Sequence, residues 1–111
     1  MHYYLGIDCG GTFIKAALFD KTGKIHACER ESLSVISEQA SYAERDMDEL
    51  WRACANVIRT TIKHSKIEPH FIKSVGISAQ GKGAFLLDKE NKPLGRAILS
   101  SDQRSQPIVK R

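Results

Sequence analysis

The sequence predicts an α/β domain with a mixed sheet, and two observations lead to this prediction. Apolar segments of strand length follow one another near the N-terminus, and one longer segment then shows the three- and four-residue apolar spacing of an amphipathic helix. Another strand segment comes after the helix. Because the helix returns the chain, this later strand would lie parallel to the first.

The first three elements are predicted to form an antiparallel meander. Tyr3 to Asp8 reads as a buried strand, and Thr12 to Asp20 is a second strand with mixed alternation. The sequence DKTG, from Asp20 to Gly23, is a turn that leads into a third strand, Lys24 to Ser32. A loop from about Leu33 to Arg45 follows.

A helix is predicted from Asp46 to about Lys63. Asp46 with Glu49 three residues later resembles a capping box, with Asp as the cap. We expect one apolar stripe of this helix to face the sheet, with Trp51 and Cys54 in the core. The stripe consists of Met47, Leu50, Trp51, Cys54, Val57, Ile58 and Ile62.

Three more strands are predicted after the helix, and together the elements indicate a core of the ribonuclease-H or actin type. The strands are Lys73 to Ala79, Gly83 to Lys89 and a short Ala97 to Ser100. The sequence KENKP, from Lys89 to Pro93, supplies the turn between the last two strands. A meander, a helix and a parallel strand are the elements of that core.

Composition excludes several classes of protein. The chain has 111 residues, of which 41% are hydrophobic and 27% charged, so it is one ordinary globular domain. The formal net charge is +4, but Lys and Arg are scattered and no polybasic block is present. Neither a signal peptide nor a run of about 18 apolar residues occurs. We therefore expect a cytoplasmic protein without nucleic-acid or membrane partners.

The cysteines and the histidines near the helix end favour no metal site. Cys9, Cys28 and Cys54 are odd in number and lack metal-ligand spacing, so reduced thiols are expected. His64 and His70 lie in the polar exit from the helix and are expected on the surface.

The sequence DCGGT, from Asp8 to Thr12, allows two explanations. A Gly-Gly pair between strands supplies the positive φ angles of a tight hairpin. Alternatively, the N–H groups of Gly10, Gly11 and Thr12 form a concavity for a phosphate. Asp8 would repel a bare phosphate, but a carboxylate suits Mg²⁺ bound to one. Lys15 either points into the same crevice or is solvated.

A second turn repeats this arrangement later in the chain. Gly76-Ile77 followed by residues 78–81 (SAQG) echoes Gly6-Ile7 followed by residues 8–11 (DCGG). Both turns would emerge from equivalent ends of two parallel strands. Polar turns that meet at one end of a parallel pair make a plausible binding crevice.

Four segments of the sequence are distinctive: DCGGT at 8–12, AERDMDELW at 43–51, GISAQGKGAFLLDKENKPL at 76–94 and AILSSDQR at 97–104. Together they resemble the N-terminal part of the FGGY carbohydrate kinases. Within that family, the Gln-Gly-Lys of Gln80 to Lys82 and the Ser-Ser-Asp of Ser100 to Asp102 resemble the branch that acts on L-xylulose or 3-keto-L-gulonate. At the turn of residues 80–82, glycerol kinases have Arg-Glu and D-xylulose kinases have Met-His.

The resemblance implies a two-domain enzyme that transfers the γ-phosphoryl group of Mg·ATP to a sugar hydroxyl. It implies that Asp8 contacts Mg²⁺, and that the turn with Gly11 and Thr12 holds phosphate. The sugar pocket would include Gln80, Gly81, Lys82 and Asp102. A glycine-rich hairpin with solvated side chains is the alternative for residues 80–83. A surface salt bridge or a helix start is the alternative for residues 102–104.

Complete kinases of this family are several times longer than 111 residues. Their general base, adenosine-binding residues and second phosphate loop would lie beyond Arg111, so no catalytic residue is expected in this chain. We expect residues 1–111 to be the N-terminal part of the first, sugar-binding domain, ending in the start of a helix around Ile108. The remainder of this domain and the second, ATP-binding domain would be absent, and the chain alone would be inactive.

A rival hypothesis is a non-catalytic actin-like binding or interaction module. In that case the edge of the sheet would pair with a partner or with a second copy of the chain, giving a possible homodimer. The kinase hypothesis expects a sugar and a nucleotide as its partners instead.

Overall fold

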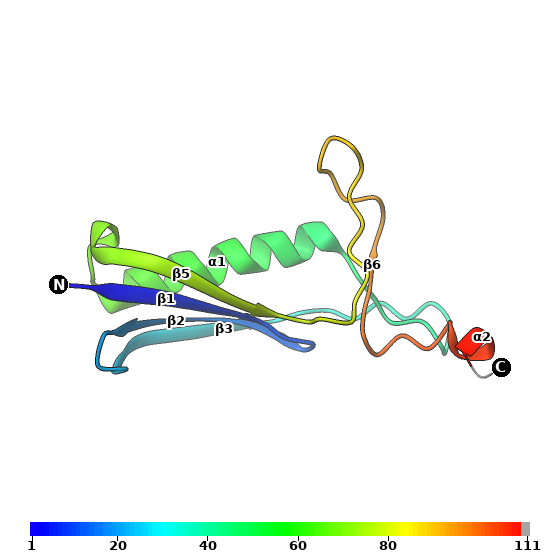
Figure 1. The fold of residues 1–111 in the computed structure, drawn as a ribbon, viewed down its shortest axis with the longest axis horizontal. Coiled ribbons are helices and arrows are strands. Elements are labelled where there is room, and N and C mark those ends of the chain that lie inside the picture. Colours follow the sequence, from blue (N-terminus) through cyan, green and yellow to red (C-terminus); the bar gives the residue numbers. More distant parts are fainter. Residues whose placement is uncertain (110–111) are drawn as a thin grey trace.

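A four-stranded mixed sheet with one long helix across one face forms the body of the protein (Figure 1). The structure is a computed structural model that describes residues 1–109. The strand order is β3-β2-β1-β5. The bounds of these elements are Tyr3–Cys9 for β1, Phe13–Asp20 for β2, Ile25–Ser32 for β3, Met47–Ser65 for α1 and Ile72–Ala79 for β5.

The predicted topology is confirmed. Strands β1, β2 and β3 form an antiparallel meander, each within one residue of its predicted bounds. Strand β5 pairs with β1 in parallel, and Gly6 lies opposite Gly76 while Asp8 lies opposite Ser78. The two turns that echo each other in the sequence therefore leave the same edge of the sheet.

Alternation along the strands places the core on one side of the sheet. Odd-numbered residues of β1 and even-numbered residues of β2 face α1, as expected for a period of two. The helix packs on β2 and β3 through small residues, which let it lie close to the sheet. The core consists of Tyr3, Leu5, Ile7, Ile14, Ala16, Leu18, Leu33, Ala53 and Val57.

The prediction that Trp51 lies in the core is wrong. Its side chain is 72% exposed, whereas Ala53, Val57 and Thr61 are the buried residues of α1. The apolar stripe is wider than the face that the sheet covers. Because α1 lies over β2 and β3, a hollow remains between the helix and β5 in the described part of the chain. Trp51 lines this hollow together with Ile77 of β5, so the sheet does not cover it. Cys54 is partly buried against the core, which agrees with its predicted position.

The predicted start of the helix is confirmed, but not the full capping box. The Asp46 carboxylate accepts hydrogen bonds from the N–H groups of Asp48 at 2.8 Å and Glu49 at 3.1 Å. The Glu49 carboxylate accepts from the N–H of Ser34 at 2.9 Å. This contact ties the loop after β3 to the helix. At the other end, Lys66 adopts the left-handed conformation with φ 60°.

A small second sheet follows the first, and one predicted strand is absent from it. Strand β4 (Glu44–Arg45) pairs with β6 (Ala97–Ile98), which is shorter than predicted. Residues 83–89 form only isolated bridges and no strand, so that prediction is wrong. Residues 83–89 find only the two-residue strand β6 and their own turn as bridge partners. These partners are too short for a continuous ladder of hydrogen bonds. The turn itself is confirmed, with Asn91 at φ 65°.

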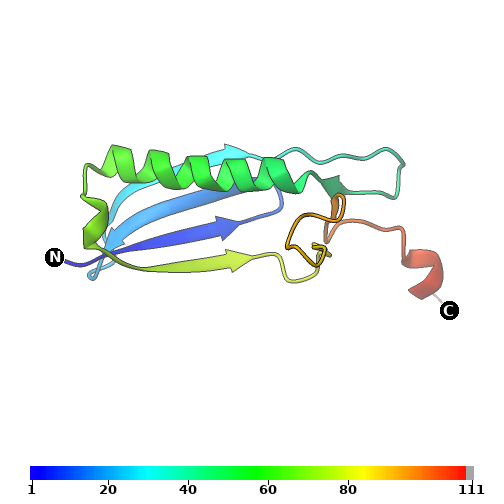
Figure 2. The same cartoon turned by 90° about the horizontal axis from the view of Figure 1, so that it is seen from above.

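The described chain is elongated, and its ends lie far apart. The principal extents are 55 × 29 × 21 Å, with the N-terminus beside the sheet and the C-terminus beyond β4 and β6 (Figure 2). The predicted helix around Ile108 is present as α2 (Gln106–Val109). A short 3₁₀ turn, η1 (Pro69–Phe71), precedes β5. All three cysteines are free, and both His64 and His70 are exposed, as predicted.

Candidate functional site

The turn between β1 and β2 presents two free amides. We call residues 10–12 the glycine turn. The N–H of Gly10 donates to Phe13 O at 3.0 Å, so this amide is used inside the hairpin and is unavailable to a phosphate. Within residues 1–109, the amides of Gly11 and Thr12 have no hydrogen-bond partner. These two amides are the donors that a bound anion would find.

Close contact, and not a positive φ angle, explains the glycine at position 10. Residues 10–12 do connect β1 and β2 as a hairpin, but among the described glycines only Gly23 and Gly95 have positive φ, so the positive φ angles expected for the Gly-Gly pair are wrong. A Cβ added to Gly10 would lie 3.1 Å from Phe13 O. On Gly11 it would lie 3.4 Å from Nε2 of Gln80. The backbone is therefore crowded at Gly10, whereas a Cβ on Gly11 would meet only a side chain at an ordinary contact distance.

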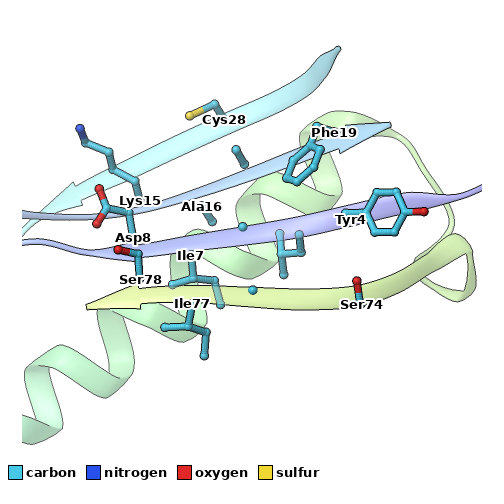
Figure 3. Close-up of a pocket in the computed structure, with 14 residues that line it drawn as sticks. Tyr4, Ile7, Asp8, Lys15, Ala16, Phe19, Cys28, Ser74, Ile77 and Ser78 are labelled. Atoms are coloured by element: carbon cyan, nitrogen blue, oxygen red, sulfur yellow. The ribbon is translucent and has the colours of Figure 1, made fainter. Parts of the chain in front are cut away.

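Asp8 and Lys15 lie side by side on the face of the sheet opposite α1 (Figure 3). Asp8 is opposite Lys15 on β2 and opposite Ser78 on β5. In the described part of the chain, no ion pair or hydrogen bond involves the Asp8 carboxylate. The carboxylate is exposed and open to a cation.

The donor set around Asp8 fits Mg²⁺ bound through a substrate. No group of three or more His, Cys, Asp or Glu side chains gathers anywhere in residues 1–109. A dedicated protein cage for a metal is thus not found there. Mg²⁺ is often held by one or two carboxylates together with water and substrate phosphates. A lone exposed aspartate can supply the carboxylate of such a site.

The same face of the sheet carries a hollow of about 720 Å³. Asp8, Lys15 and Ser78 line one end of it, and Tyr4 and Phe19 line the other (Figure 3). The ring centroids of Tyr4 and Phe19 are 5.9 Å apart. Gly6 and Gly76, which have no side chains to fill the hollow, form part of its floor, and its lining is largely apolar.

The predicted sugar-binding turn lies next to the glycine turn. The Gln80 side chain lies beside Gly11 of the glycine turn, and its Oε1 accepts a hydrogen bond from the Ser100 hydroxyl at 3.3 Å. Gly81 and Lys82 are exposed. The structure thus brings the predicted phosphate and sugar residues of these two turns together. Their binding roles stay predictions.

Asp102 is held in a structural cluster. Its side chain is only 4% exposed and accepts from the N–H of Ala43 at 2.7 Å and from Arg104 at 2.8 Å. Arg104 also bonds to Glu44 at 2.6 Å and lies over the ring of Tyr42. These hydrogen bonds hold the pKa of Asp102 well below its usual range, and the bond from Arg104 contributes most. Asp102 therefore does form an ion pair, as the alternative explanation expected, but the pair is not at the surface on the Asp102 side. The predicted sugar contact of Asp102 stays a prediction.

Sequence reasoning missed Arg45, which lies beneath the glycine turn. The side chain is 1% exposed and donates to backbone carbonyls of the glycine turn and of Ser34. Arginine is rarely fully buried, and this one directly precedes a helix cap in a run of charged residues. No local pattern distinguishes it from a solvated arginine.

Among the helices of residues 1–109, none is both long and apolar enough to cross a bilayer. The mixed sheet, its order and the helix on one face define a domain of the ribonuclease-H/actin-like class. Two glycine-rich turns at one sheet edge add a candidate binding site to this fold.

The chain belongs to the FGGY family of carbohydrate kinases, because the model of that family's N-terminal domain matches residues 3–111. It is 74% identical over 110 residues to a probable L-xylulose kinase of Pasteurella multocida, and this match covers 99% of this chain and 23% of that protein. It is 53% identical over 109 residues to the L-xylulose/3-keto-L-gulonate kinase of Escherichia coli, covering 98% of this chain and 22% of that protein.

The solved structures agree with this assignment. A xyloylose kinase from Brucella ovis superposes with a TM-score of 0.89 and 33% identity, over 94% of this chain and 22% of that one. The chain thus spans 22% or 23% of the length of these relatives. A glycerol kinase from Natranaerobius thermophilus shares less identity, 32% over 108 residues, or 96% of this chain and 22% of that protein.

Proposed function

We propose that the complete protein carrying this chain is an ATP-dependent kinase that phosphorylates a hydroxyl of a ketose such as L-xylulose. The observation that carries this proposal is the identity of 74% and 53% to kinases named for L-xylulose, against 32% to a glycerol kinase. Specificity within such a family depends on which side chains meet the sugar hydroxyls. Residues 80–82 are the candidates for this difference.

In this proposal the glycine turn and Asp8 serve the phosphate end of the reaction. The free amides of Gly11 and Thr12 donate to phosphate oxygens, and Lys15 contributes a positive charge nearby. The Asp8 carboxylate holds Mg²⁺, which supplies neutralisation of the phosphate charge when it is bound. Positioning and charge neutralisation account for most of the catalysis in phosphoryl transfer.

The second turn serves the sugar end of the reaction. Gln80 offers both a donor and an acceptor, and Lys82 offers only donors, which suits a ketone or carboxylate oxygen. Because Gln80 also lies beside Gly11, the sugar hydroxyl and the phosphate would be held by neighbouring turns. Asp102 would support this pocket through the backbone N–H of Ala43.

The 111 residues would provide only part of the active site. We propose that they form the N-terminal part of the sugar-binding domain. The general base and the adenosine pocket then belong to the rest of the polypeptide, consistent with relatives of which the chain spans 22% or 23%. ATP and Mg²⁺ are the expected cofactors.

A substrate panel tests the proposal. The complete polypeptide would be assayed for ADP release with L-xylulose, 3-keto-L-gulonate, D-xylulose and glycerol at equal concentrations. We expect the highest kcat/KM for one of the first two. Preference for glycerol or D-xylulose would contradict the substrate class, and no ADP release with any of the four would contradict the kinase assignment.

A further inference from the structure

Arg45 is a buried cation whose hydrogen-bond acceptors are backbone carbonyls. It donates to Gly11 O at 2.6 Å, to Gly10 O at 3.5 Å and to Ser34 O at 3.3 Å. None of the ion pairs found in residues 1–109 includes it. Burying an unpaired charge is costly, so the buried guanidinium of Arg45 needs an explanation beyond packing.

The two peptide groups of the glycine turn share one orientation. The carbonyl of Gly10 and the N–H of Gly11 belong to one peptide, and the carbonyl of Gly11 and the N–H of Thr12 belong to the next. Described peptide bonds are all trans, so each N–H points opposite to its carbonyl. Because Arg45 binds both carbonyls, both N–H groups point away from it, and these are the two amides without a partner.

The charge of Arg45 favours the same ligand as the amides do. Burial lowers the pKa of the guanidinium, but arginine remains charged at neutral pH. A cation that bonds to a carbonyl polarises its peptide and strengthens the N–H on the far side as a donor. The positive charge also lies beneath the point at which an anion would bind.

We propose that Arg45 is a positioning residue that holds the amides of Gly11 and Thr12 in the orientation needed to bind a phosphate group. This inference rests on the proposed kinase function and names a residue that supports its phosphate site without touching substrate. The fork geometry of arginine is required because it reaches carbonyls of the glycine turn and of Ser34 at once.

The test compares Arg45→Met, Arg45→Lys and Thr61→Val in the complete polypeptide. Thr61 is a matched control, since it is also buried, on α1, and its hydroxyl donates to the backbone carbonyl of Ala16 at 3.3 Å, away from the turn. We expect Arg45→Met to lower kcat roughly 10- to 100-fold, as misplacing binding groups does. Arg45→Lys should lower kcat less than Arg45→Met does. In both variants the KM for the sugar should stay within about threefold of its value in the unsubstituted protein.

Thr61→Val should lower the melting temperature without this loss of kcat at a temperature where the protein is folded. Unchanged kcat in Arg45→Met, or a loss that follows the melting temperature equally in both variants, would overturn the proposal. If Arg45→Met does not fold, Arg45→Lys decides, and a kcat equal to that of the unsubstituted protein would overturn it.

A second measurement separates this inference from the kinase assignment. Amide resonances of Gly11 and Thr12 would be followed by NMR during titration with inorganic phosphate. We expect saturable shifts in the unsubstituted protein and in Thr61→Val, and their loss in Arg45→Met. Absence of shifts in the unsubstituted protein, or their retention in Arg45→Met, would overturn the role of Arg45. Kinase inactivity with intact phosphate shifts would overturn only the proposed reaction.

Discussion

The Nε2 atom of Gln80 lies 3.4 Å from the position that a Cβ on Gly11 would occupy. This proximity relates two turns that are far apart in the sequence, one after β1 and one after β5. The parallel register of those strands, with Asp8 opposite Ser78, brings the turns to the same edge. A substitution in one turn should therefore affect the other.

Alanine substitutions should distinguish the two glycines of the turn. Gly10→Ala would press a Cβ against the carbonyl of Phe13, and we expect a loss of about 1–3 kcal/mol in the free energy of unfolding. Gly11→Ala meets only a flexible side chain and should cost less. Gly81→Ala is the control, because a Cβ at that position would have no described atom within 4 Å beyond its chain neighbours. Urea denaturation measures all three, and an equal loss for Gly10→Ala and Gly81→Ala would contradict the crowding.

If the complete polypeptide is the proposed kinase, Asp8→Asn should lower its turnover strongly while leaving the sugar KM nearly unchanged. The substitution removes the charge proposed to hold Mg²⁺ at the transferring phosphate. Steady-state kinetics at several Mg²⁺ concentrations measure this. Asp48→Asn, an exposed aspartate on α1, is the matched control and should keep normal turnover. Normal turnover of Asp8→Asn at low Mg²⁺ would remove the metal role.

Trp51→Ala should cost the described domain little stability, because the side chain is 72% exposed. Val57→Ala should cost about 2 kcal/mol, since Val57 is 2% exposed and packs against the sheet. Chemical denaturation of the 111-residue chain provides the comparison. A larger loss for Trp51 than for Val57 would show that the helix packs with the other side inward.

The cluster around Arg104 should make stability depend on acid pH. Hydrogen bonds from Arg104 lower the pKa values of Glu44 and Asp102 below their ordinary values of 4.5 and 3.8. Their contribution is therefore fully present above about pH 5 and is lost as the pH falls through the lowered values. Arg104→Met should reduce the fall in melting temperature between about pH 5 and pH 2. Arg52→Met, at an exposed arginine, is the control and should leave that fall unchanged.

The 111-residue chain by itself should neither phosphorylate sugar nor bind Mg·ATP at submicromolar concentration. A few amide contacts open to water provide roughly millimolar affinity. Titration calorimetry, beside an ADP-release assay with L-xylulose, measures both. Tight nucleotide binding, or turnover above the blank without protein, would show that these residues hold a complete active site.

Local patterns in the sequence were sufficient for most of the fold. Apolar segments of strand length, separated by turn residues, predict the strands of the meander, and Asp46 marks the helix start, because these features act between near neighbours. Residues 83–89 show the limit of such patterns. They carry apolar residues but find only isolated bridges, and whether a strand forms depends on a partner that the local sequence does not specify.

The sequence by itself determined the order of the elements, the two glycine-rich turns and the acid beside the first. Only the tertiary structure decided which side of α1 is covered and which charged residues are buried. Trp51 is exposed because the helix lies over β2 and β3, and Arg45 is buried because the glycine turn folds over it. Both outcomes depend on contacts between distant segments, and the periodicity of a single segment does not contain that information.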